Sequence, residues 1–341
     1  MKRLLVHHRS QHHASISGYD RLVGYIDGQL ISGQQFILPY RMAKFIAQSH
    51  NQNKGIYNSS SVYKDIHLFK ALFPFFNNDD VIHYLHGERD IRSIFKMKFL
   101  LKQSVVCATF HKPPEILKTQ IPNPKVLKKL NGAIAVGQNQ VDFLKEWLGL
   151  KTVEYIPHGV DVNFFKPGGI EKRNNRLLFV GQHLRDFEAL NFCAPVLTNK
   201  IKDLKIDVVL RKDFYDKVNE HEVITMHSNI DDAKLKGLYQ KADLLFLPLL
   251  DVTACNSILE AMACGLPIIT TNVGGNTDYL ANTENVMVSK NNHEQLIEQT
   301  TMLLKDEEML LKMGKSSREK ALEYSWESIG KRVLNYYKKL C

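Results

Sequence analysis

Short apolar runs alternate along the chain with stretches in which apolar residues recur every three or four positions. In the first half, the runs predict strands at residues 3–7, 81–85, 104–110, 132–136 and 152–156. In the second half, they predict strands at residues 177–180, 206–210, 223–226, 244–247 and 268–271. Because helical spacing fills many of the intervals, the pattern favours a doubly wound α/β architecture with two parallel sheets.

Chain length and a linker-like segment divide the sequence. The chain has 341 residues, whereas one domain usually holds about 100–200. Residues 165–175 are rich in glycine, proline and charge, as linkers are, so we expect one domain at 1–166 and a second at 167–323. The remaining segment, 324–341, contains a predicted helix from Trp326 to Leu340 with apolar residues along one face.

The amino-acid composition limits the cellular locations and the binding partners that we expect for the protein. No apolar run approaches the roughly 20 residues of a membrane-spanning helix, and the opening run is too short for a signal peptide. The five cysteines are scattered, so we expect a cytoplasmic protein with reduced thiols. A formal net charge of +9 indicates an anionic partner: nucleotide phosphate, an anionic bilayer such as the inner face of the plasma membrane, or nucleic acid.

One predicted helix start has two interpretations. Residues 256–275 read NSILEAMACGLPIITTNVGG, in which Asn256 or Ser257 can cap a short helix and Gly265 can end it in the left-handed conformation. Ser257 and Glu260 have the spacing of a capping box, which is a structural role. Alternatively, the amides of residues 256–259 form an anion site, and Glu260 accepts hydrogen bonds from sugar hydroxyls.

Two motifs together resemble a known family. They are YIPHGVDVNFFKP at 155–167 and LEAMACGLPIITTNVGG at 259–275, and the similarity extends through residues 248–261 and 324–334. They resemble the retaining glycosyltransferase family 4, closely in the second half of the chain and loosely in the first. The resemblance implies an α/β fold of the GT-B type: two Rossmann-like doubly wound domains facing a central cleft, with the C-terminal helix crossing back to the first domain.

The resemblance also implies a division of roles. The first domain would bind the acceptor and the second a nucleotide sugar. Glu260 would hold the ribose hydroxyls, and the helix start before it would hold the diphosphate through Asn256, Ser257, Ile258 and Leu259. The family's earlier glutamate is replaced by Val252. The neighbouring Asp251 either serves in its place near the transferred sugar or forms a turn.

The cations expected to hold the phosphates also depart from the family pattern. Gln182 stands where the family usually has an arginine. Arg185 is the nearby cation that could neutralise the leaving diphosphate, unless it pairs on the surface with Asp186 or Glu188. Arg211 or Lys212 could add a second charge, although a surface position is favoured for Lys212.

Further candidates lie after other strands. The resemblance places the nucleobase at the loop 226–231, which includes His227, and a glycine loop at Gly18, which an ordinary helix-start turn also explains. His111 follows the strand 104–110, where a family histidine contacts the sugar; a hydrogen-bonded loop histidine is the alternative. His86 is a second candidate on the acceptor side. A metal site is not favoured for four histidines near the start of the sequence, because no carboxylate or cysteine nearby completes a set of metal ligands. They are His7, His8, His12 and His13.

The predicted function is retaining transfer of a sugar from a nucleotide diphosphate donor, preferably a UDP-sugar, to a hydroxyl of a saccharide or lipid-linked saccharide. It would serve cell-surface polysaccharide or glycoconjugate synthesis, with no cofactor and no metal. A GT-B epimerase and a catalytically silent sugar- or membrane-binding module remain alternatives. Nucleic acid is disfavoured because basic residues are dispersed. Segments 92–102 and 125–130 mix basic and apolar residues, as a helix on an anionic bilayer or a helix packed on its own domain would.

Overall fold

The computed structural model describes residues 2–7, 16–33, 39–49, 59–72, 80–91, 94–95, 101, 104–169 and 174–341. Their contacts divide the chain into two compact units. Unit 1 comprises the described residues of Met1–His13, Gly18–His158 and Trp326–Cys341, and unit 2 those of Ala14–Ser17 and Gly159–Ser325. The changes of unit therefore fall at 158/159 and 325/326, rather than at the 166/167 and 323/324 expected from the sequence.

Unit 1 is built on a parallel sheet of six strands in the order β2-β1-β3-β4-β5-β6. The strands are β2 (Gln29–Ile31), β1 (Arg3–Val6), β3 (Val81–Tyr84), β4 (Val105–Phe110), β5 (Gly132–Ala135) and β6 (Val153–Tyr155). Its described helices are α1 (Tyr40–Ser49), α2 (Ser59–Leu72), α3 (Gly87–Asp90), α4 (Pro114–Gln120), α5 (Val141–Leu148) and α12 (Trp326–Leu340). Short 3₁₀ helices are η1 (Tyr19–Gly24), η3 (Leu127–Lys129) and η4 (Gln138–Gln140).

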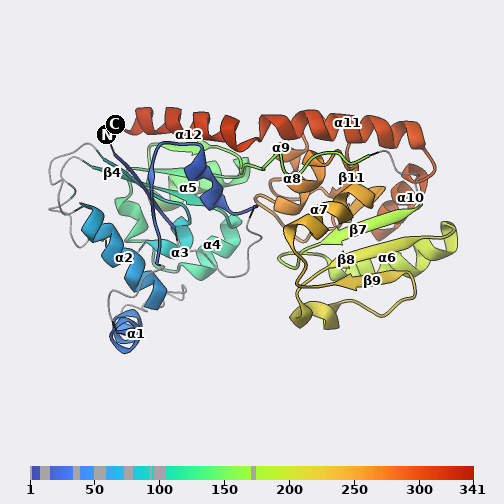
Figure 1. Ribbon diagram of the computed structural model, residues 1–341, viewed down its shortest axis with the longest axis horizontal. Helices are drawn as coiled ribbons and strands as arrows, with labels where there is room; N and C mark the ends of the chain where they lie inside the picture. The colour runs from blue at the N-terminus through green and yellow to red at the C-terminus, as the bar shows by residue number, and fades with distance from the viewer. Residues whose placement is uncertain are drawn as a thin grey trace. The chain divides into compact units, whose positions relative to one another are not determined.

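Unit 2 repeats this plan with the order β12-β11-β10-β7-β8-β9, again all parallel. The strands are β12 (Val286–Val288), β11 (Ile268–Thr271), β10 (Leu244–Leu247), β7 (Arg176–Val180), β8 (Lys205–Val209) and β9 (Ile224–His227). Its helices are α6 (Phe187–Lys200), η5 (Lys212–Lys217), α7 (Asp232–Lys241), α8 (Asn256–Ala263), α9 (Asn276–Tyr279), α10 (His293–Leu303) and α11 (Glu307–Glu323) (Figure 1).

These sheets confirm the predicted fold class. All ten predicted strands are present with ends shifted by at most one residue. The central strands are buried, as in parallel sheets covered on both faces, whereas the edge strands β6 and β9 are not. Two three-residue edge strands, β2 and β12, were not predicted, since two of the three residues in each are not buried.

The terminal helix α12 packs on unit 1, which confirms the expected return of the chain. Its apolar face buries Trp326, Ile329, Val333 and Tyr337. In Figure 1, α12 is red whereas the strands of unit 1 are blue to green, so unit 1 combines the two ends of the described sequence. Within the described part of the chain, no helix combines the length and the apolar character needed to cross a membrane.

Candidate functional site

In unit 2, a cation and a helix start meet at the carboxyl edge of the sheet. Arg185 follows β7, and α8 follows β10, the strand hydrogen-bonded to β7. The Arg185 guanidinium donates to the Ser257 hydroxyl at 3.1 Å and to the Val180 carbonyl at 2.8 Å. Ligands of parallel sheets bind at this edge. The alternative of a surface pair with Asp186 is not supported, because Asp186 instead caps α6 by accepting from the Ala189 amide.

The start of α8 differs from both sequence interpretations. Its N-cap is Cys255, and no side chain caps it, so the capping role predicted for Asn256 or Ser257 is wrong. Ser257 turns its hydroxyl to Val180 and Arg185. The amides of Ile258 and Leu259 both donate to the Cys255 carbonyl at 3.1 Å, so they are not the unengaged donors expected. The amides of Asn256 and Ser257 are left for an anion.

Glu260 lies on α8, just beyond its first turn, and is only 4% exposed. Its Oε1 accepts a short hydrogen bond from the Ser17 hydroxyl, and its Oε2 accepts from the Tyr239 hydroxyl at 2.8 Å. Burial raises the pKa of Glu260 to about 7, and the two hydrogen bonds oppose that shift. The predicted capping box is therefore wrong, because both carboxylate oxygens accept from side chains outside α8.

Asp251 uses its carboxylate locally. Oδ1 accepts from the amide of the next residue, Val252, at 2.7 Å. The Val252 carbonyl accepts from Gly275 at 2.9 Å, and a Cβ on Gly274, whose φ is +49°, would lie 2.8 Å from Asp251 Oδ1. This geometry favours the turn interpretation. The buried Val252 provides no replacement for the family's glutamate.

The other expected donor contacts of unit 2 are engaged elsewhere. Arg211 binds Asp213 through two hydrogen bonds, one of them 3.0 Å long, and Lys212 is exposed on η5. His227 Nε2 lies 2.7 Å from Asp207 Oδ1, and Asp207 also binds Arg176 at 2.6 Å. The His227 side chain thus ties β9 to β8, which leaves backbone groups of the loop at 228–231 to contact a base.

The N-terminal loop contributes a residue that the sequence did not indicate. Gly18 has φ −75°, so it is not left-handed, and a Cβ there would collide with the Asp20 carboxylate. The preceding Ser17 belongs to unit 2 by its contacts. Its hydroxyl donates to Glu260, and its carbonyl accepts from the Asn256 side chain at 3.0 Å. Ser17, not Gly18, therefore contacts the predicted ribose site.

In unit 1, His111 has a defined tautomer. It follows β4, and its Nε2 lies 2.8 Å from the Leu85 carbonyl. Because a carbonyl only accepts, Nε2 bears the proton and Nδ1 is an acceptor. Burial, and secondarily the nearby His158, lower the pKa of His111 well below its ordinary value, so the ring is neutral. A neutral Nδ1 suits the O–H of a sugar.

Four histidines follow strand ends at the carboxyl edge of the unit 1 sheet. His7 follows β1, His86 follows β3, and His158 follows β6, as His111 follows β4. Ring centroids lie 4.3 Å apart for His86 and His111, 5.1 Å for His7 and His86, and 6.0 Å for His111 and His158. The sequence indicated His111 and His86; His158 was missed, although its place after a predicted strand was the available signal.

Glu88 is a further residue of this edge that the sequence did not indicate. It is 8% exposed, and its Oε1 accepts from the His111 amide at 3.3 Å. Burial raises its pKa to about 7. Among the described residues, no group of three or more His, Cys, Asp or Glu side chains is arranged to hold a metal ion. His8, His12 and His13 lie outside the described residues.

A buried hydrogen-bonded chain connects α12 with this edge. His83 Nδ1 lies 2.7 Å from the Tyr337 hydroxyl, and Nε2 lies 2.7 Å from Thr109 Oγ1. Thr109 donates to the Tyr19 hydroxyl at 3.4 Å. The Tyr19 ring then packs edge-on against His111, with centroids 4.8 Å apart, and against Trp326 at the start of α12. Helix α12 thereby supports the side chain on which His111 rests.

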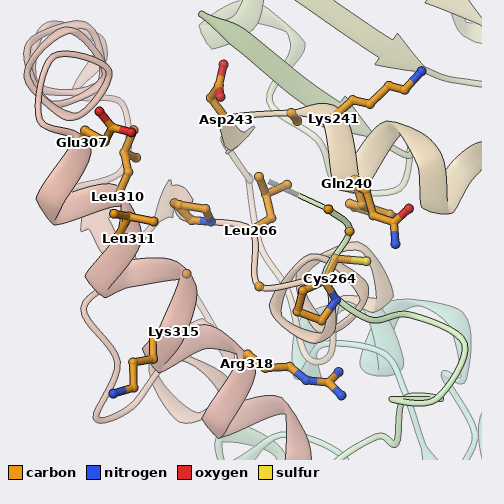
Figure 2. A pocket seen from close by; sticks show the side chains of 18 of the residues that line it. Gln240, Lys241, Asp243, Cys264, Leu266, Glu307, Leu310, Leu311, Lys315 and Arg318 are labelled. Carbon is orange, nitrogen blue, oxygen red and sulfur yellow. The ribbon is translucent and has the colours of Figure 1, made fainter. Parts of the chain in front are cut away.

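A cavity of about 480 Å³ lies at the opposite edge of the unit 2 sheet. Figure 2 shows Leu310 and Lys315 of α11 on one side and Gln240 near the end of α7 on the other. Two further lining residues lie at the amino ends of strands. Asp243 directly precedes β10, and Leu266 lies two residues before β11. Because ligands of parallel sheets bind at carboxyl ends, this cavity is separate from the predicted donor site.

The two basic segments have different outcomes. In 92–102, only residues 94–95 and 101 are among those described, so the predicted amphipathic helix otherwise lies outside the described residues. Residues 125–130 form a turn and the 3₁₀ helix η3. Leu127 and Leu130 are buried in the core of unit 1, so this segment packs on its own unit.

Comparisons with known proteins agree with this geometry. Residues 187–320 match the family model described as "Glycosyl transferases group 1". A D-inositol 3-phosphate glycosyltransferase of Arthrobacter sp. is 28% identical over 145 residues, 36% of this chain and 34% of that protein. A phosphatidyl-myo-inositol mannosyltransferase of Propionibacterium freudenreichii is 24% identical over 277 residues, 76% of this chain and 70% of that protein. The chain thus spans about a third of the first relative.

A solved structure extends the similarity to the fold of the whole chain. The Anabaena protein HepE, solved in complex with UDP and glucose, matches with a TM-score of 0.69 at 14% identity and covers 99% of this chain and 100% of its own. Together with the family match and the relatives, this similarity confirms the resemblance to glycosyltransferases of the GT-B fold.

Proposed function

We propose that this chain of the GT-B glycosyltransferase type moves a sugar from a nucleotide diphosphate donor to an acceptor hydroxyl, with retention of configuration. The observation that supports this most is the hydrogen bond from Arg185 to Ser257 at the start of α8. It brings a cation and helix-terminal amides to one edge of the unit 2 sheet, where a diphosphate would be bound by both.

The donor half of the proposal assigns one task to each group. The amides of Asn256 and Ser257 and the guanidinium of Arg185 bind the diphosphate, and Glu260 accepts from the ribose hydroxyls after Ser17 releases it. As the bond between the anomeric carbon and the diphosphate oxygen breaks, its electron pair moves to that oxygen. Arg185 stabilises the growing charge. The acceptor oxygen attacks the same face, and its proton goes to the departing diphosphate oxygen.

A uridine donor is preferred. This preference rests on the Anabaena structure, whose description includes UDP and glucose. The loop 228–231 gives no further support. Because the His227 side chain is bonded to Asp207, backbone groups of the loop would contact the base, and the residue types there discriminate little between uracil and guanine.

The acceptor half rests on unit 1. His111, neutral and with Nδ1 as acceptor, would take a hydrogen bond from a hydroxyl of the sugar in the reacting complex. A saccharide or a lipid-linked saccharide is proposed as acceptor, within cell-surface polysaccharide or glycoconjugate synthesis. The name of the Propionibacterium relative, a phosphatidyl-myo-inositol mannosyltransferase, supports an acceptor that is bound to a lipid.

Calorimetry and product analysis test the proposal. UDP is expected to bind the wild type more tightly than GDP, and UDP-glucose is expected to release UDP and give an α-linked product by NMR. Absence of binding by either nucleotide would overturn the donor site. Interconversion of UDP-N-acetylglucosamine without release of UDP would identify an epimerase, and binding of UDP without any turnover of UDP-sugars would identify a silent binding module.

A further inference from the structure

Helix α1 of unit 1 exposes apolar side chains that a helix in water would normally bury. Phe45 is 73% exposed, Tyr40 57% and Met42 53%. Exposed side chains of this size are otherwise scattered over the described residues, whereas here three fall within six consecutive positions. Figure 1 shows α1 at the outer end of α2, away from the strands of its unit. This cluster indicates an interaction surface.

The inner face of α1 packs against α2, so the exposure of Phe45 does not arise because α1 has no packing partner. Ala43 and Ala47 are buried against α2, where they pack with Val62 and Tyr63. At 100° per residue, these two alanines point in one direction, and Phe45 points almost in the opposite one, between Arg41 and Met42. Helix α1 therefore has a second apolar face, directed at solvent.

Basic side chains line one side of this second face. Around the helix, Arg41 and Lys44 are exposed on one side of Phe45 and Met42 lies on the other, and the sequence of α1, YRMAKFIAQS, contains no acidic residue. Alternation of cations with an aromatic side chain and methionine is the composition of a helix that lies in the headgroup region of an anionic bilayer. There, Phe45 and Met42 would enter the acyl boundary while Arg41 and Lys44 bind lipid phosphates.

We propose that the outer face of α1, formed by Arg41, Met42, Lys44 and Phe45, binds the surface of an anionic bilayer. It would hold unit 1, which we propose to bind the acceptor, beside a lipid-linked saccharide. The binding itself does not depend on sugar transfer, although its purpose rests on the proposed function. It also locates the membrane contact on a helix different from the segments 92–102 and 125–130.

Vesicle sedimentation tests this surface on the full chain. The wild type is expected to sediment with vesicles of phosphatidylcholine and phosphatidylglycerol and to remain in solution with phosphatidylcholine alone. The double variant Arg41→Gln, Lys44→Gln is expected to lose about thirtyfold in partition coefficient, from about 1 kcal/mol per charge near the surface. The double variant Met42→Ser, Phe45→Ser is expected to lose at least about tenfold.

Matched control variants separate a specific surface from general attraction by a basic chain. Met302 and Leu311 in unit 2 are 57% and 60% exposed, close to the values for α1. Met302→Ser, Leu311→Ser is therefore expected to bind vesicles as the wild type does. An equal loss in this control and in the α1 variant would overturn the proposal, because neither apolar pair would then be specific.

A fluorescent variant tests insertion directly. Phe45→Trp keeps an aromatic side chain at the centre of the face and is expected to be quenched by lipids brominated on the acyl chains, beyond any quenching of the two native tryptophans in the wild type. If Phe45→Trp shows no more quenching than the wild type, the proposed insertion of this face is wrong. If the wild type ignores anionic vesicles but Met42→Ser, Phe45→Ser converts a dimer into a monomer, the occupant is a second copy and the bilayer assignment is wrong. UDP binding, measured separately, tests the proposed function independently.

Discussion

The Tyr239 hydroxyl donates a 2.8 Å hydrogen bond to Glu260 Oε2, and both side chains are buried within unit 2. The second oxygen of the same carboxylate accepts from Ser17. Each oxygen of Glu260 thus already has one protein donor before any nucleotide arrives. Where a ribose hydroxyl takes the place of the Ser17 hydroxyl, one hydrogen bond is exchanged for another, so the net gain in free energy is smaller than that of a new hydrogen bond.

Glu260→Ala is expected to affect both folding and binding. Removal of the carboxylate leaves the buried Tyr239 hydroxyl without this acceptor, which costs about 1–3 kcal/mol of unfolding free energy, and it removes the proposed ribose contact. Urea unfolding would measure the first effect, and calorimetry with UDP the second, expected as at least a tenfold loss of affinity. Tyr239→Phe is the control for the first effect alone. An unchanged UDP affinity in folded Glu260→Ala would return the residue to a structural role.

The raised pKa of Glu260 predicts a dependence of binding on pH. Burial stabilises the protonated acid up to about pH 7, whereas ribose hydroxyls donate to the ionised form. Affinity for uridine, which lacks phosphate, should therefore rise with pH, by at most about tenfold per unit below pH 7, and level off above it. Calorimetry between pH 5.5 and 8.5, chosen to span that value, would measure this, and Glu260→Gln should remove the slope.

The same shift predicts how stability depends on pH. A carboxyl whose pKa is raised by folding from 4.5 to about 7 binds more protons in the folded state than in the unfolded state between these values. Its contribution to stability is therefore complete below about pH 4.5 and declines as the pH rises through 7. Compared with Glu260→Gln, the wild type should lose stability over this range in urea titrations. A constant difference between the two would contradict the shift.

Arg185→Ala is expected to slow turnover more than it weakens ground-state binding. The charge on the diphosphate grows as the glycosidic bond breaks, so loss of the guanidinium should lower kcat by about a hundredfold or more, while UMP affinity changes by less than about threefold. Steady-state kinetics with UDP-glucose and calorimetry with UMP would separate the two. Arg211→Ala, which only breaks an exposed pair with Asp213, should turn over at nearly the wild-type rate.

Tyr337→Phe is expected to disturb His111 through the buried chain. His83 has a pKa lowered by burial to about 3, so it is neutral and needs one donor and one acceptor. Without the Tyr337 hydroxyl, Nδ1 of His83 loses its donor, so the His83 ring is held less firmly and the chain through Thr109 to Tyr19 is disturbed. The ¹⁵N signals of His111 should shift, and the KM for the acceptor should change more than kcat. Tyr336→Phe is the control, because its hydroxyl makes a marginal 3.4 Å contact with Thr152.

The sequence predicted the fold more completely than the site because the two depend on different information. Strands such as 244–247 are buried runs whose pattern is local, and the motif at 259–275 identified α8 and Glu260. The partners of Glu260 are Tyr239, 21 positions away, and Ser17, 243 positions away, and no periodicity connects them. Only the fold could likewise show that the amides of Ile258 and Leu259 are engaged.

The sequence pattern likewise could not predict which apolar side chains of α1 are exposed to solvent. Phe45 and Ala43 both belong to an apolar pattern in α1, but which of them faces α2 depends on how the two helices pack. The basic segment at 125–130 had a similar composition, yet its leucines are buried in unit 1.

The interruption of unit 1 by unit 2 affects how the chain is made. Strands β1 to β6 leave the ribosome before unit 2. Two side chains of α12 leave it after unit 2: Trp326, which contacts Tyr19, and Tyr337, which contacts His83. At 5–20 residues per second, translation of the intervening unit takes roughly ten to thirty seconds. Unit 2, nearly continuous in sequence, has its residues together earlier. Unit 1, which begins before unit 2, is thus completed after it, and until then the side chains of unit 1 that pack on α12 are without this helix.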